Sequence, residues 1–153
     1  MATPRTDRPY MQFNFLVNLG TGADPEKDAD AGFQEVSNIG MEVTVAEYRN
    51  GNAKVNNVQK VTGLNKATDV TLKRGVMGTL TLYKWLNEIR DGRTSGTRNV
   101  VIQLQSEDRG AVVLTWKLQG ARIIKYVCGP MNAKGNDVAM EELVIAYERL
   151  EME

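Results

Sequence analysis

The feature that most constrains the fold is a recurring alternation of apolar and polar residues along short stretches of the chain. In residues 11–19 every odd-numbered position is apolar, from Met11 to Leu19, and most of the positions between them are polar. A period of two puts alternate side chains on one face of a β-strand, so this stretch predicts a strand with one buried face. Further strand signals occur at residues 33–39, 41–49, 68–75, 100–105, 111–118 and 121–128.

One segment has helical periodicity instead. Over about residues 79–91, apolar side chains from Leu82 to Ile89 recur at spacings of three and four, which is typical of a helix with one apolar side. Gly92 follows, and glycine is common directly after a helix because it adopts positive φ without strain. The chain is therefore predicted to be mainly β, with about seven strands and one main helix.

The last segment, residues 138–150, fits two patterns. Met140, Leu143 and Tyr147 belong to an acceptable helical stripe, and the composition favours a helix. Leu143, Ile145 and Tyr147 also alternate with other residues, as in a strand. The residues alone leave both structures open.

Residues 50–66 predict an extended loop or hairpin arm. Asn50-Gly51 is a strong hairpin-turn dipeptide, because both central residues of a type I′ turn need positive φ. The residues that follow are mostly polar and include three lysines but no acid. Long ordered loops in compact domains are usually functional, so we expect a role for this arm.

The composition excludes most catalytic chemistry. The 153 residues include no histidine, the usual general base and commonest metal ligand, and a single cysteine, Cys128. A Ser-His-Asp triad, a Cys/His zinc cluster and an internal disulfide are therefore excluded. With no histidine to activate it, Cys128 is interpreted as a packing residue. We expect no enzyme, no cofactor and no metal site, although two distant carboxylates could still form a glycosidase-type pair.

Charge and hydropathy limit the possible partners. Nineteen basic and nineteen acidic residues cancel, so no net field attracts nucleic acid or an anionic membrane. Residues 20–32 are rich in Gly, Asp and Ala and predict a surface loop. They do not form a calcium-binding EF-hand, because Ala31 and Ser37 stand where a loop that starts at Glu26 needs Gly and Glu. No secretory signal and no apolar run of the ~18 residues that a membrane span needs is visible. We expect a protein made in the cytoplasm without a signal peptide and without membrane insertion.

Three stretches carry motifs in a characteristic order and spacing. They are Leu72-Lys73-Arg74-Gly75 with Leu82, Tyr83 and Trp85; Trp116 with Gly120-Ala121 and Lys125-Tyr126; and Gly129-Pro130 with Val138-Ala139-Met140-Glu141-Glu142-Leu143. Together they resemble the contractile phage tail-tube family, which also supplies the inner tubes of phage-derived bacterial injection systems. The resemblance covers nearly the whole chain. One departure is the helix start, residues 75–80, where relatives often carry acids.

The resemblance implies a small β-barrel or sandwich flanked by the helix, with residues 1–153 as a single tail-tube domain. It implies hexameric rings that stack into a tube, with strands of neighbouring subunits joined into one inner wall. It also makes residues 138–150 a strand. The implied partners are further copies of the chain, a sheath protein, spike, baseplate and tube-cap proteins, and cargo or a tape-measure protein in the lumen. The particle is a phage tail or a phage-tail-like injection system.

The resemblance also assigns roles to residues. The arm is expected to reach a neighbouring subunit or the adjacent ring through Asn50, Gly51, Lys54, Asn57, Lys60 and Lys66. The residues expected to have structural roles are Lys73, Arg74, Gly75, Trp85, Trp116, Glu141 and Glu142. Two other functions compete with the tube subunit: a type VI secretion-like secreted ring protein, and an unrelated carbohydrate-binding β domain.

Overall fold

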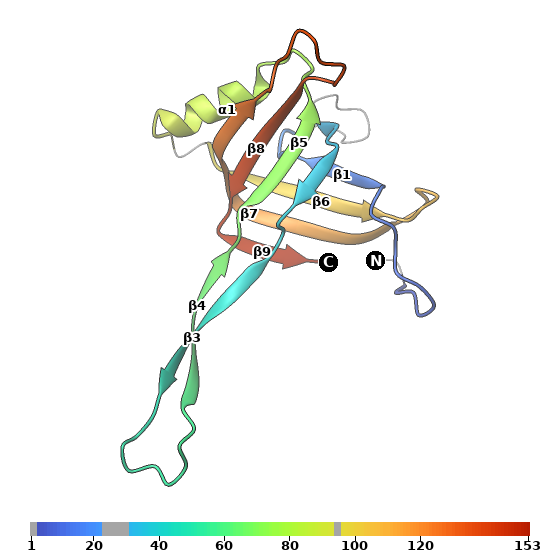
Figure 1. Ribbon diagram of the computed structural model, residues 1–153. Coiled ribbons are helices and arrows are strands. Elements are labelled where there is room, and N and C mark those ends of the chain that lie inside the picture. Colours follow the sequence, from blue (N-terminus) through green and yellow to red (C-terminus); the bar gives the residue numbers. More distant parts are fainter. Residues whose placement is uncertain (1–2, 23–30, 94–95) are drawn as a thin grey trace.

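The computed structural model describes residues 3–22, 31–93 and 96–153. The predicted loop at residues 20–32 lies largely outside them. Within the described residues the chain forms nine strands and one helix (Figure 1). In chain order these are β1 (Phe15–Asn18), β2 (Glu35–Ser37), β3 (Met41–Tyr48), β4 (Gln59–Ala67), β5 (Val70–Gly75), α1 (Thr81–Arg90), β6 (Arg98–Gln105), β7 (Val112–Cys128), β8 (Met140–Ala146) and β9 (Arg149–Met152).

Seven strands form two antiparallel sheets that share β7, and together with α1, which packs against β7, they make up the body. The first sheet pairs β1 with β6, β6 with β7, and β7 with β9. The second pairs β2 with β5, β5 with β8, and β8 with β7. Their strands run in different directions (Figure 1). Strands β1 and β2 end the strand order without pairing with each other, so the body is sandwich-like and not a closed barrel.

Strand β7 passes from one sheet to the other at Gly120. Before this point Leu118 pairs with β6 and β9, and after it Arg122 pairs with β8. Gly120 has a φ of 64°, which favours glycine, and a Cβ there would lie 2.9 Å from the carboxyl carbon of Glu148. The sequence predicted two strands here, at residues 111–118 and 121–128. The structure has one bent strand instead, because glycine lets the backbone turn without ending it.

The core lies between the two sheets and against α1. Trp85 is fully buried, its Nε1 donates a 2.6 Å hydrogen bond to the carbonyl oxygen of Gly96, and the guanidinium of Arg98 lies 4.6 Å from its ring centre. The buried apolar residues of this core are Val17, Leu19, Val70, Leu72, Leu82, Trp85, Val100, Ile102, Leu118, Ala121, Ile123, Leu143, Ile145 and Tyr147.

Helix α1 has the apolar side that the sequence predicted, and Gly92 ends it with a φ of 76°. Its start is unusual. Leu80 occupies the N-cap position, no side chain caps the free backbone N–H groups, and the first turn contains no acid. Ser, Thr, Asp and Asn are the residues preferred at this position. The helix therefore begins without the local stabilisation that most helices have.

The observed strand boundaries differ from the predicted ones at both ends of the chain. Only residues 15–18 of the predicted strand 11–19 pair in a sheet, and Met11 and Phe13 are exposed. Residues 138–150 contain strand, as the family resemblance implied, but they divide into β8 and β9. The division follows from the bend of β7, because β8 pairs with its second half and β9 with its first.

Candidate assembly surface

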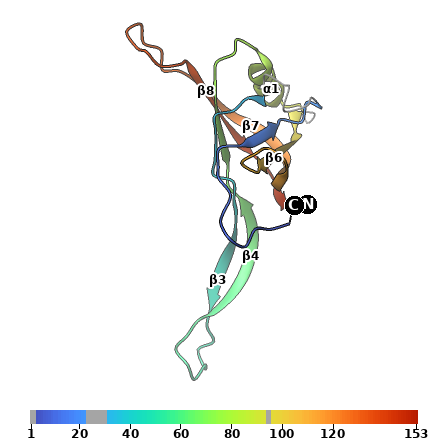
Figure 2. The ribbon, with the colours of Figure 1, turned by 90° about the vertical axis from the view of Figure 1, so that its right-hand side faces the viewer.

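The most distinctive surface is the arm, the hairpin of β3 and β4, which projects away from the body (Figure 2). Every residue of β3 is exposed, and in β4 only Ala67 is partly covered. The arm is longer than residues 50–66, because its two strands extend from Met41 to Ala67. An isolated two-stranded hairpin is marginally stable in water. An ordered arm of this length therefore suits contact with something outside the subunit.

The arm contains a β-bulge. Residues Val43 and Val45 pair with Asn65 and Thr62, so β4 has one extra residue opposite Thr44. The hydroxyl of Thr44 donates to the carbonyl oxygen of Leu64 at 3.0 Å. A Cβ on Gly63 would lie 2.9 Å from that hydroxyl oxygen, so glycine makes room for it.

The tip of the arm is the loop of residues 49–58, and the predicted type I′ turn is wrong. Neither Asn50 nor Gly51 has a positive φ. Instead, the carbonyl oxygen of Asn50 accepts a hydrogen bond from the backbone of Ala53 at 3.1 Å. The guanidinium of Arg49 donates to the carbonyl oxygens of Ala53 and Val55. These longer-range contacts within the tip outweigh the preference of the Asn-Gly pair.

The predicted contact residues occupy two places on the arm. Lys60 and Lys66 lie on β4, directly opposite Glu47 and Glu42 of β3, so cross-strand charges of opposite sign face each other. The sequence suggested lysines without acidic partners, because the acids come from the earlier strand. The other four predicted residues, Asn50, Gly51, Lys54 and Asn57, are all exposed on the tip.

The apolar residues of the arm are functional candidates that the sequence pattern misassigned. The alternation at residues 41–49 has the period of a strand with one buried face, but every residue of β3 is exposed. Met41, Val43, Val45 and Leu64 are exposed, Leu64 to 83%. Exposed apolar side chains on a projecting element are a candidate surface for contact with another chain.

The root of the arm is fixed to the body. The hydroxyl of Tyr147 donates to the carbonyl oxygen of Gly40 at 2.7 Å, and the backbone N–H of Thr68 donates to the same oxygen at 3.0 Å. The hydroxyl of Thr68 reaches the carbonyl oxygen of Asn38 at 2.7 Å. The bond from Tyr147 joins the start of the arm to the end of β8, and the bonds from Thr68 join the two roots of the arm to each other.

Two of the motif residues form a buried ion pair. Arg74 on β5 and Glu141 on β8 are 1% and 5% exposed, and Nε of Arg74 donates to Glu141 Oε1 at 2.5 Å. The hydroxyl of Tyr126 on β7 donates to the second carboxylate oxygen. This hydrogen bond, with burial, raises the pKa of Tyr126. The network joins three neighbouring strands of the second sheet.

The other motif residues of this sheet lie on or near its outer face. Lys73 is in register with Glu35 on β2 and Glu142 on β8, and its Nζ lies 3.7 Å from the carboxylate of Glu35. Gly75 ends β5 beside Val138. One row of residues on this face therefore alternates acid, base and acid across three strands.

Trp116 borders the open seam between the unpaired edges of β1 and β2. Trp116 is half-buried. Together with Phe13, Phe15 and part of strand β6, it lines a groove of about 560 Å³. Glu35 is the one acid among the described residues that line this groove. A glycosidase needs two carboxylates about 5–10 Å apart, so the groove lacks the pair that such chemistry requires.

The described part of the chain gives no further support for a catalytic or metal site. No group of three or more Cys, Asp or Glu residues among residues 3–22, 31–93 and 96–153 could hold a metal ion. Cys128 is exposed at the end of β7, which contradicts its interpretation as a packing residue, because this end of the strand lies outside the core. No helix in the described ranges is long and apolar enough to span a membrane.

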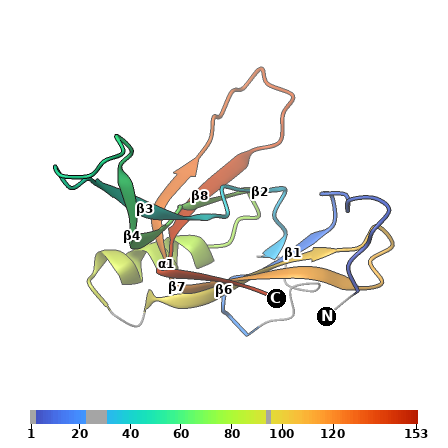
Figure 3. The same ribbon diagram turned by 90° about the horizontal axis from the view of Figure 1, so that it is seen from below.

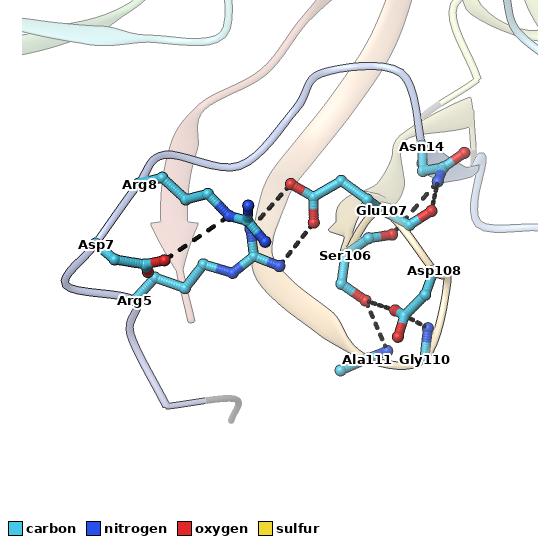
Figure 4. Close-up of polar contacts among 9 residues, drawn as sticks. All are labelled: Arg5, Asp7, Arg8, Asn14, Ser106, Glu107, Asp108, Gly110 and Ala111. Atoms are coloured by element: carbon cyan, nitrogen blue, oxygen red, sulfur yellow. Dashed lines mark hydrogen bonds and ion pairs between the residues drawn. The ribbon is translucent and has the colours of Figure 1, made fainter.

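A clasp attaches the N-terminal segment to the β6–β7 turn (Figure 4). The guanidinium of Arg5 donates to both carboxylate oxygens of Glu107, at 2.9 and 2.7 Å, and lies 4.0 Å from the ring centre of Tyr10. Asn14 Nδ2 donates to the carbonyl oxygens of Ser106 and Glu107. The hydrogen bond from Arg5 is the main cause that lowers the pKa of Glu107 to about 2. No sequence motif indicates this contact, because it joins two segments that are far apart in the chain.

Comparison with known proteins identifies related structures. A family model described as T4-like virus tail tube protein gp19 matches residues 11–151. The chain is 25% identical to a chain of the sheath–tube complex of the PVC extracellular contractile injection system, with a TM-score of 0.81 and coverage of 96% of this chain and 93% of that one. It is 26% identical to a chain of the sheath/tube terminator of the same system, with a TM-score of 0.80 and coverage of 97% and 99%.

A more distant likeness shows the fold alone. Hcp1 from Flavobacterium johnsoniae is 11% identical to the chain, with a TM-score of 0.53 and coverage of 90% of this chain and 93% of that one. The comparison with curated proteins finds no match.

The buried ion pair generates a prediction about stability. Replacing Glu141 by Leu leaves the charge of Arg74 buried without its carboxylate, so the free energy of unfolding should fall by about 3–5 kcal/mol. The double variant Arg74→Met/Glu141→Leu removes both charges and should lose much less. Urea unfolding of the dissociated subunit measures both values, and equal losses in the two variants would contradict this account.

The N-terminal clasp generates a prediction about pH. The ionised carboxylate of Glu107 holds Arg5, and its pKa of about 2 lies below the ordinary value of 4.5. The clasp should therefore be complete above about pH 4.5 and should be lost as the pH falls towards 2. NMR titration of the Glu107 carboxyl carbon should give a midpoint near 2 in the parent protein. In Arg5→Gln the midpoint should move towards 4.5. An unchanged midpoint would rule out the hydrogen bond from Arg5 as the cause of the low pKa of Glu107.

Proposed function

The chain belongs to the family of T4-like virus tail tube proteins and is a tube subunit of a contractile injection apparatus; we propose that it acts as stacked hexameric rings with no catalytic step. The rings form a rigid channel for DNA or effector cargo. Contraction of a surrounding sheath drives this channel into the target. The tube itself needs rigidity and a polar wall, and no active site.

One observation carries this proposal, namely the exposed arm. Its strands are joined to the body at Gly40 and Thr68, yet most of its apolar side chains stay exposed among the residues that the structure describes. Such a surface is a liability in a monomer and a contact in an assembly. A contact between two different faces of identical subunits closes into a ring or continues as a filament.

The second sheet supports the inner wall of the tube. Beyond Ala121, β7 pairs only with β8 among the described strands, and β2 pairs only with β5. These two strands end the sheet on opposite sides, so a copy on each side can extend it by strand pairing. The face that carries Glu35, Lys73 and Glu142 then lines the lumen, where mixed charges keep cargo from adhering.

The relatives indicate the partners. Similar chains occur in a sheath–tube complex and a tube terminator of one injection system, and by this likeness we assign the chain a sheath partner and a tube-cap partner. Spike and baseplate proteins at the other end, and cargo or a tape-measure protein in the lumen, complete the proposed particle. The subunit is made in the bacterial cytoplasm and assembles there into a tail or tail-like particle.

Graded shortening of the arm tests this proposal by electron microscopy of the assembled particles. One variant replaces residues 49–58 by Asn-Gly, which joins the register partners Tyr48 and Gln59. A second replaces residues 42–66 in the same way and joins Met41 to Ala67. The body should keep its circular dichroism and melting temperature in both. Tubes should become fewer and shorter in the first variant and be absent in the second, and normal tubes in the second would overturn the proposal.

A further inference from the structure

The Asn50-Gly51 pair in the tip of the arm has a chemical property that does not depend on the turn predicted for it. It is the only asparagine in the 153 residues that is followed by glycine. The backbone nitrogen of the residue after an asparagine can close a five-membered ring on the side-chain carbon Cγ. Glycine hinders this approach least, because it has no side chain. The pair is therefore the asparagine position most open to ring closure.

The fold leaves this pair accessible. Both residues are exposed, and they lie outside the paired strands of the arm. A Cβ on Gly51 would meet no atom within 4 Å, and within the described residues the N–H of Gly51 donates no hydrogen bond. Figures 1 and 2 show the tip far from the body, and in the view from below it again lies to one side of the body (Figure 3). Neither packing nor strand pairing therefore holds the nitrogen of Gly51 in place.

A second pair, Asp91-Gly92, shows how the fold can prevent the same ring closure. Gly92 has a φ of 76°, and its N–H donates to the carbonyl oxygen of Ile89 at 3.1 Å at the end of α1. This hydrogen bond occupies the nitrogen that would have to attack Asp91. The reactivity of such a pair therefore depends on its place in the structure as well as on its sequence.

A hydroxyl group contacts the amide that would react. The hydroxyl of Tyr48, the last residue of β3, donates a 2.8 Å hydrogen bond to Oδ1 of Asn50. Negative charge builds up on this oxygen when a nucleophile adds to Cγ. A hydrogen-bond donor on the oxygen stabilises that charge, as the donors of an oxyanion hole do. The arm therefore supplies both an accessible nucleophile and a group that activates the amide.

We propose that Asn50 is a site of spontaneous deamidation that the hydroxyl of Tyr48 assists. The nitrogen of Gly51 loses its proton and bonds to Cγ of Asn50. The C–N bond of the side-chain amide breaks, and the amide nitrogen takes up a proton and leaves as ammonia. Water then adds to either carbonyl carbon of the resulting succinimide ring and opens it to aspartate or isoaspartate. In sum, an amide and water become a carboxylic acid and ammonia, with no oxidation or reduction.

The reaction changes the charge of the tip. Residues 49–58 contain Arg49 and Lys54 and no acid, so their formal charge falls from +2 to +1 when Asn50 becomes a carboxylate. The isoaspartate product also lengthens the backbone by one methylene group. Under the proposed tube function, on which this consequence rests, Asn50 belongs to the arm that contacts another copy. A subunit that stays unassembled therefore acquires an altered contact surface.

Mass spectrometry of peptides tests the modification in the purified full-length chain, incubated at mildly alkaline pH in water enriched in heavy oxygen. Asn50 should lose its side-chain nitrogen, take up heavy oxygen and give both aspartate and isoaspartate. Asn57 is the internal control, because it is exposed in the same tip but is followed by Val58, whose branched side chain hinders the nitrogen. An unchanged Asn50, or aspartate as the only product, would overturn the proposal.

Two variants test the roles of the neighbouring residues. Gly51→Ala places a methyl group beside the attacking nitrogen in otherwise open space, so conversion should slow by about tenfold or more. Tyr48→Phe removes the hydrogen bond from an exposed side chain and should slow conversion by about two- to tenfold. An unchanged rate in Gly51→Ala would contradict attack by this nitrogen, and an unchanged rate in Tyr48→Phe would contradict assistance by the hydroxyl.

A final measurement separates this proposal from the proposed function. Tubes assembled from a partly converted pool should contain a smaller fraction of converted chain than the subunits that remain unassembled. Equal fractions would contradict the effect of conversion on the contact surface. A parent chain that forms no tubes would instead contradict the tube function, and conversion of Asn50 would still be measurable in it.

Discussion

Strand β7 belongs to both sheets of the body, and its bend at Gly120 decides which strands pair with each of its halves. Its first half holds β6 and β9, and its second half holds β8. The two sheets therefore diverge from one shared strand, and the outer edges of β1 and β2 are left without a partner strand among the described residues. In such a body the central strand is held by strand pairing, while the outermost strands each have a free edge. This combination suits a subunit that must be rigid and must also join its copies.

The sequence predicted what depends on local periodicity. Val70 and Leu72 alternate because one face of β5 is buried, and Trp85 lies on the apolar side of a helix for the same reason. Val43 and Val45 follow the same alternation on the exposed arm. Alternation shows that a strand has two different faces, but it does not show what covers the apolar face. The cover of the arm, on our account, belongs to another chain.

Contacts between residues far apart in the sequence cannot be predicted from the pattern of residues. Arg74 and Glu141 are 67 residues apart, and Arg5 and Glu107 are 102 apart, so only the folded chain brings their charges together. The segment from Met140 onward had the periodicity of both a helix and a strand, and the family resemblance was needed to choose between them.

The central claim is that an arm exposed in the isolated subunit is buried in the tube. Hydrogen exchange of the backbone amides of β3 and β4, compared between dissociated subunits and assembled tubes, measures this directly, and buried β5 serves as the internal reference. We expect exchange in the arm to slow by about a hundredfold or more on assembly, while exchange in β5 changes little. Equal exchange rates for the arm in both states would contradict the claim.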